Sequence, residues 1–168
     1  MDTPGLADQQ LREAAADAIK KGLTQNGFYN VFFAMSFQNG RVRPDDVTTM
    51  KLVLEAAPIM SYGIITNQVG VKAYESIHTD SHVRGKVVNA LWFNFPQEKR
   101  EANIRFAAKD AELEEGGNVV KPLPDALRAF IQATPAVVIA ANEVKDVFDS
   151  PGQRLARISA QLSTEGIS

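Results

Sequence analysis

The chain has 168 residues, of which 45% are hydrophobic and 23% are charged, and it carries a formal net charge of −2. This length and composition are typical of an ordinary globular protein and exclude a globally disordered chain. We therefore expect one globular domain covering residues 1–168. The slightly negative charge disfavours a dedicated nucleic-acid-binding protein, because such proteins usually carry a strong basic excess.

Cysteine is absent from the sequence. Its absence excludes disulfides, thiolate metal sites and cysteine nucleophiles, and it favours the cytoplasm. The N-terminus lacks the basic segment and apolar run of a signal peptide. The longest mainly apolar runs, 28–37 and 87–95, are far shorter than the roughly 20 residues that span a bilayer. We expect a soluble, cytoplasmic protein with no membrane partner.

The first predicted element is a helix over 5–23, where apolar side chains recur at spacings of three and four residues. Thr3 and Pro4 suit the start of this helix, and Asn26-Gly27 suits its end. Residues 28–37 are rich in aromatic and β-branched side chains, which favour a pleated and half-buried surface. They predict a central strand with apolar side chains on both faces.

The dipeptide Asn39-Gly40 predicts a turn after that strand. A second helix is expected over 44–57, because Pro44, Asp45 and Asp46 favour a helix start. Beyond Pro58, residues 60–66 and 69–77 predict two short strands, although the glycines in both segments weaken strands. Residues 83–95, which contain Trp92, predict a further strand closed by Pro96.

Residues 96–115 combine early acids and alanines with a terminal glycine pair, which favours a helix. Alternation at Ile104, Phe106 and Ala108 would also fit a strand. A short helix is expected over 125–133, a buried strand over 135–141 and an amphipathic helix over 151–162.

This order predicts an α+β fold. We expect a mixed or antiparallel sheet of about four to five strands packed with about four to five helices, with an α/β sandwich as the alternative.

The only histidines, His78 and His82, flank Asp80. On one helical turn such a spacing would place both imidazoles on the same face, where Asp80 could act with them as a catalytic or metal-binding group. A metal site usually needs three or four ligands, and the chain has no further histidine or cysteine. The composition also suits a solvated loop. We therefore predict no metal and no cofactor, and keep His78, Asp80 and His82 as catalytic candidates.

Four basic residues, Arg41, Arg43, Arg84 and Lys86, flank the aromatic segments. Arginines beside aromatic side chains are one way in which proteins bind single-stranded nucleic acid, and Arg100 and Arg105 on the following predicted helix could extend the patch. The alternative is that the aromatic residues belong to the core while the basic ones keep the surface hydrated, which the negative net charge favours.

The sequence carries no phosphate-binding glycine loop and no nucleophile-elbow motif. Our first hypothesis is therefore a non-enzymatic protein-interaction or regulatory module, whose partner is another protein or a second copy of this chain. The second is an enzyme that uses His78 or His82 with a carboxylate. The third is a nucleic-acid-binding protein that uses the local basic patch.

Overall fold

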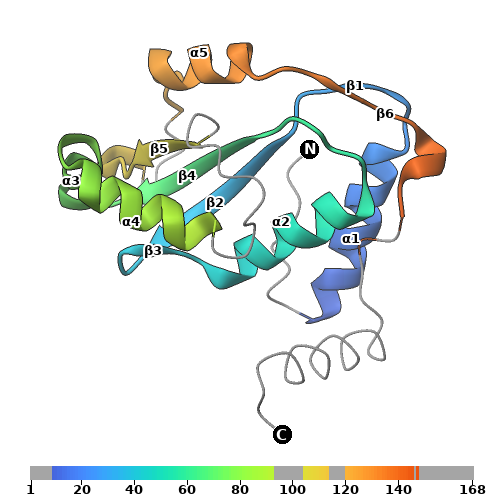
Figure 1. Ribbon diagram of the computed structural model, residues 1–168, viewed down its shortest axis with the longest axis horizontal. Coiled ribbons are helices and arrows are strands. Elements are labelled where there is room, and N and C mark those ends of the chain that lie inside the picture. Colours follow the sequence, from blue (N-terminus) through green and yellow to red (C-terminus); the bar gives the residue numbers. More distant parts are fainter. Residues whose placement is uncertain (1–8, 93–103, 114–119, 146, 148–168) are drawn as a thin grey trace, which may run out of the picture.

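The computed structural model describes residues 9–92, 104–113, 120–145 and 147. Within them the chain folds into an α+β domain of five α-helices, a four-stranded mixed sheet and a separate two-stranded sheet (Figure 1). The helices are α1 (Gln9–Leu23), α2 (Pro44–Ala56), α3 (Val71–Thr79), α4 (Ser81–Trp92) and α5 (Asp125–Ala133). The strands are β1 (Gly27–Tyr29), β2 (Phe32–Gln38), β3 (Arg41–Val42), β4 (Gly63–Val69), β5 (Ile104–Ala108) and β6 (Val137–Ile139).

The four-stranded sheet has the order β3-β2-β4-β5, in which β2, β4 and β5 run parallel and β3 runs antiparallel to β2. The predicted turn at Asn39-Gly40 is confirmed and joins β2 to β3. Both turn residues have positive φ, 51° for Asn39 and 81° for Gly40, as a two-residue hairpin turn with the twist of its strands requires. Helices make the longer connections between the parallel strands, with α2 before β4 and α3 and α4 before β5.

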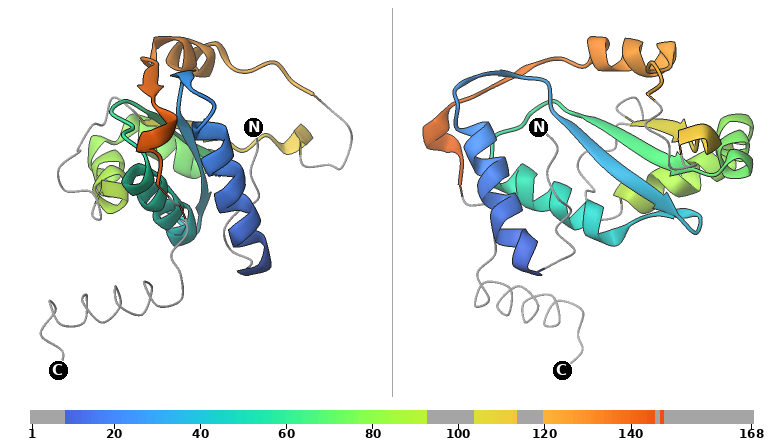
Figure 2. Two further views of the ribbon diagram at one scale, coloured as in Figure 1. Left: turned by 90° about the vertical axis from the view of Figure 1, so that its right-hand side faces the viewer. Right: turned by 180° about the vertical axis from the view of Figure 1, so that it is seen from behind.

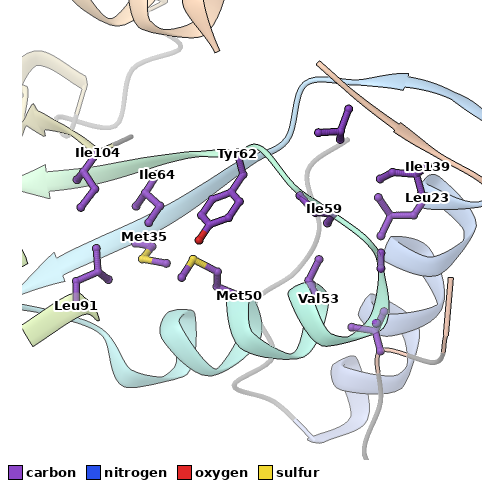
Figure 3. Close-up of a cluster of buried hydrophobic side chains, with 14 of the residues drawn as sticks. Leu23, Met35, Met50, Val53, Ile59, Tyr62, Ile64, Leu91, Ile104 and Ile139 are labelled. Carbon is purple, nitrogen blue, oxygen red and sulfur yellow. The ribbon is translucent and has the colours of Figure 1, made fainter. Parts of the chain in front are cut away.

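One face of this sheet carries the core, and we call it the helix face. It consists of the side chains that β2, β4 and β5 direct toward α2 and α4. Met35, Ile64 and Ile104 are at most 1% exposed there. Figure 3 shows these side chains above Met50 of α2 and Leu91 of α4, and the same cluster continues to Leu23 of α1 and Ile139 of β6. A single apolar core therefore joins the four-stranded sheet to the two-stranded one.

The opposite face of the sheet, which we call the open face, presents the alternate residues of the same strands. Its side chains are small, polar or partly exposed, namely those of Ala34, Ser36, Ile65, Asn67, Arg105 and Ala107. Helix α5 lies on the far side of the sheet from α2 (Figure 2, right). It packs through Phe130, whose ring meets Phe32 edge-on at a centroid distance of 5.9 Å.

Three of the predicted helices are confirmed in the described residues. Helix α1 occupies 9–23 of the expected 5–23, and α2 and α5 match their expected ranges to within one residue. The expected cap at Thr3 and Pro4 and the expected helix over 151–162 lie outside the described residues. The strand over 28–37 is confirmed only in part, because the chain breaks at Asn30-Val31 into β1 and β2.

The two strands expected over 69–77 and 83–95 are wrong, since these segments form most of α3 and α4. Valines and aromatics gave them the local composition of strands, but the buried or half-buried positions Val83, Val87 and Leu91 repeat every four residues. That stripe lets α4 pack on the helix face, and burial of the stripe outweighs the weak β propensity of the valines. Trp92 ends α4, and 93–95 lie outside the described residues.

The helix expected over 96–115 is also wrong where the structure describes it. Residues 104–108 form β5, and a short 3-10 turn follows at Ala111–Leu113. Ile104 and Phe106 are buried while Arg105 between them is exposed, which is the alternation of a strand with one covered face. The edge of β4 supplies backbone partners that the sequence alone does not show, and pairing there decides the conformation.

Candidate functional site

The clearest exposed apolar feature is the two-stranded sheet of β1 and β6, which we call the ribbon. In its antiparallel register Phe28 lies directly opposite Val138, while Gly27 faces Ile139 and Tyr29 faces Val137. Phe28 is 82% exposed and Val138 is 64% exposed, whereas Val137 and Ile139 are 8% and 0% exposed. The ribbon therefore packs one face on the core and presents an apolar cross-strand pair on the other.

Side-chain hydrogen bonds hold both ends of the ribbon in place. At one end the Asn26 side-chain carbonyl accepts from the backbone N–H of Ala141 at 2.9 Å, and at the other Asn30 donates to the Thr134 carbonyl at 2.9 Å. The Tyr29 hydroxyl also donates to the carbonyl of Leu23 at 3.3 Å. Because these contacts and the buried inner face fix the alternation, the exposure of Phe28 and Val138 is part of the folded structure and not the fraying of a loose end.

The ribbon is more exposed than the sequence predicted. The aromatic and β-branched composition of 28–37 and 135–141 indicated buried strands, yet each strand of the ribbon is only three residues long and covered on one side. Pro135 and Ala136, just before β6, are exposed as well. Phe28 is the middle residue of β1, so the alternation of the strand turns its side chain outward. This exposure could not be recognised from the sequence without knowing that the strand ends at Tyr29.

The two histidines belong to different helices, since α3 ends at Thr79 and α4 begins at Ser81. His78 is exposed, its ring stacks on Tyr74 at a centroid distance of 4.1 Å, and its Nδ1 lies 2.9 Å from the Tyr74 carbonyl oxygen. His82 is exposed in the first turn of α4. The helical-turn geometry that would align the two imidazoles is therefore interrupted at Asp80.

Asp80 acts as a helix cap. One of its carboxylate oxygens accepts from the backbone N–H of His82 at 2.8 Å and of Val83 at 3.2 Å, at the start of α4. These are the N–H groups that a helix leaves without an internal partner, so the carboxylate has a structural role that needs no imidazole. No group of three or more potential metal ligands comes together in the part of the chain that the structure describes.

The four basic candidates come from three parts of the fold, namely β3, the residue before α2, and α4. Arg41 is exposed on β3, one outer strand of the sheet, whereas the Arg84 guanidinium lies 5.5 Å from the ring centroid of Phe106 on β5, the other outer strand. Arg43 precedes α2 and pairs with Asp45 at 3.6 Å, and Lys86 is an exposed residue of α4. Arg105 lies on β5 and not on a helix, and Arg100 lies outside the described residues.

The strongest charge cluster joins the segment after β5 to the segment before α5. The Lys121 ammonium group donates to both carboxylate oxygens of Asp110, at 3.0 and 2.8 Å, and contacts one oxygen of Glu112 at 2.8 Å. The hydrogen bond from Lys121 lowers the pKa of Asp110, and the bonds to Asp110 and then Glu112 raise the pKa of Lys121. All three groups satisfy one another at the surface, so the cluster is an ordinary exposed ion-pair network.

No family model, curated protein or solved structure matches this chain. No described helix is long and apolar enough to cross a membrane. Of the surfaces above, the ribbon is the one whose chemistry differs most from an ordinary hydrated surface.

Proposed function

We propose that the protein is a non-enzymatic interaction module that binds another protein through the outer face of the ribbon. The observation that carries this proposal is the pairing of Phe28 with Val138, two large apolar side chains held side by side in solvent by a fixed strand register. Exposed apolar patches on folded proteins are frequently interaction sites.

The energetics favour coverage of this pair. Burying an exposed phenylalanine or valine side chain contributes roughly 1.5–3 kcal/mol each, so a partner that covers both gains substantial affinity. The ribbon is also held rigidly before binding, because its inner face is buried and its ends are hydrogen-bonded. A rigid surface loses little conformational entropy when a partner binds.

The backbone of the ribbon supports the same proposal. Within the described residues β1 and β6 pair only with each other, so each strand has an outer edge whose N–H and C=O groups a partner strand could meet. Edge pairing would supply hydrogen bonds while Phe28 and Val138 supply apolar contact.

The test compares affinity capture by the full chain and by the double variant Phe28→Ser/Val138→Ser, with captured proteins quantified by mass spectrometry. A partner bound through the ribbon should be depleted at least about tenfold on the double variant, because each 1.4 kcal/mol changes affinity tenfold. Self-association through the same face would instead appear as a concentration-dependent dimer in sedimentation, lost in the variant.

The matched control is Val71→Ser, which removes an exposed apolar side chain from α3, 59% exposed and outside the ribbon. This variant should retain the partner or the dimer. Circular dichroism must show the same fold for all three proteins. If wild type and double variant capture the same proteins equally and neither self-associates, the proposal is wrong.

A further inference from the structure

A hollow of about 420 Å³ lies where α5 meets β5, and its lining includes no residue of β1 or β6. Its walls come from one side of α5, from the residues that follow it and from one strand residue. The lining residues are Arg105, Ala126, Ala129, Phe130, Ala133, Thr134 and Pro135. Among the described residues, most of this lining is apolar and small, and it contains one cation and no acid.

Arg105 is the charged group of this hollow. Its guanidinium carbon lies 5.0 Å from the ring centroid of Phe130, and Nη1 donates to the carbonyl of Ile104 at 3.2 Å. None of the ion pairs found among the described residues involves Arg105. One face of the guanidinium therefore lies against an aromatic ring, and none of its N–H donors has a carboxylate partner in the part of the chain that the structure describes.

The aromatic ring under the guanidinium is firmly placed. Phe130 is 7% exposed, and its ring lies against the edge of Phe32 with an interplanar angle of 71°. Both rings approach the backbone of Gly63 so closely that a Cβ there would lie 2.7 Å from Phe32 and 2.8 Å from Phe130. The absence of a side chain at Gly63 lets this stack form, and the stack in turn orients Arg105.

The other polar group of the lining is already used. The Thr134 hydroxyl donates to the Phe130 carbonyl at 2.9 Å, so it does not offer its proton to a ligand. The three alanines of α5 leave room beside the guanidinium without adding polar atoms. A ligand here would meet one planar cation at one side and apolar methyl groups at the other.

We propose that this hollow binds an organic monocarboxylate with a compact apolar body, its carboxylate on the free edge of Arg105 and its apolar part against the alanines of α5. A planar guanidinium with unpaired edge donors matches a carboxylate in two parallel hydrogen bonds. A single cation in an apolar wall selects one negative charge and disfavours a polyanion. The carboxylate can belong to a free acid or to the C-terminus of a peptide.

The first experiment titrates the full chain with octanoate and with octan-1-ol by isothermal titration calorimetry. Octanoate should bind saturably, and octan-1-ol should bind at least about tenfold more weakly, because charge-assisted hydrogen bonds are the stronger ones. The proposal is wrong if octanoate and octan-1-ol bind equally. It is also wrong if octanoate shows no saturable binding up to about 10 mM, a concentration that would nearly saturate a site with a Kd of about 1 mM.

The second experiment uses variants of the same protein. Arg105→Gln should weaken octanoate at least about tenfold, and Arg105→Lys should weaken it as well, since lysine keeps the charge but loses the planar fork. Ala129→Leu should also weaken octanoate by filling the hollow while leaving Arg105 in place. Arg128→Gln is the matched control, because Arg128 lies on the same helix, is exposed and does not line the hollow.

The third experiment distinguishes the two sources of the carboxylate. A short peptide ending in Ala-Leu is compared as the free acid and as the C-terminal amide. Tighter binding of the free-acid peptide than of octanoate assigns the hollow to a chain end, and the reverse assigns it to a small acid. Loss of binding in Arg128→Gln equal to that in Arg105→Gln would contradict both assignments. Because the ribbon variants leave this hollow intact, octanoate binding should survive in Phe28→Ser/Val138→Ser.

Discussion

The two faces of the four-stranded sheet differ in what they are made of and in what covers them. On the helix face Met35, Ile64 and Ile104 are covered by α2 and α4. The alternate residues of the same strands form the open face, which mixes small and polar side chains with the partly exposed Phe32 and Ile65. Phe130 of α5 packs on that face against Phe32 and the backbone of Gly63. One face therefore holds most of the fully buried side chains of the sheet, and the described residues cover the other face only in part.

Adjacent isoleucines give the sharpest test of this difference. Ile64 points to the helix face and is 0% exposed, whereas Ile65 points to the open face and is only partly buried. We expect Ile64→Ala to cost about 2–5 kcal/mol of the free energy of unfolding, because it leaves a cavity in a packed core. Ile65→Ala should cost about 1 kcal/mol or less. Chemical denaturation of both variants measures the contrast, and equal losses would show that the two faces are equally packed.

A second test asks how tightly α5 is fitted to the open face. Gly63→Ala places a methyl group within 3 Å of Phe32 and Phe130, so we expect a loss of about 1–3 kcal/mol from overpacking. Gly85→Ala is the control, since a Cβ there meets nothing within 4 Å and an alanine inside a helix should stabilise by about 0.5–1 kcal/mol. If Gly63→Ala is neutral in thermal unfolding, α5 is free to shift away from the sheet.

The smallest expected effect belongs to the ion pairs that precede α5. Because the pKa of Asp110 is lowered in the folded protein, its ion pair stabilises the fold above the unfolded pKa near 3.8. This stabilisation is lost as the pH falls through the lowered folded pKa. Because the pKa of Lys121 is raised, its ion pairs stabilise the fold below the unfolded pKa of 10.5. This stabilisation is lost as the pH rises through the raised folded pKa.

Lys121→Met should therefore lower the melting temperature slightly at neutral pH, and less so in high salt, because exposed pairs are screened. The difference from wild type should vanish at the lowest pH. Lys86→Met, at another exposed lysine, is the control and should show neither dependence. A pH-independent effect of Lys121→Met would show that its side chain acts through packing and not through charge.

The candidate site was only partly predictable. Exposure of Phe28 depends on where β1 ends and on which side of the ribbon meets Ile59 and Leu23, and both are set by residues distant in sequence. The same holds for Arg105, which was expected on a helix and lies on a strand beneath α5. His78, Asp80 and His82 are close in sequence, but the capping role of Asp80 depends on the break between two helices, which the sequence analysis did not predict.

Elements with local signals could be predicted from the amino-acid sequence. Helical spacing and the Pro44-Asp45-Asp46 start predicted α2, and Asn39-Gly40 predicted the hairpin, because capping and turn geometry depend on a few adjacent residues. In contrast, packing and strand pairing in the folded protein make 71–79 and 81–92 helical and 104–108 a strand. Their composition fits either state, and the choice is made by what each apolar stripe can bury and by which backbone edge is available for pairing.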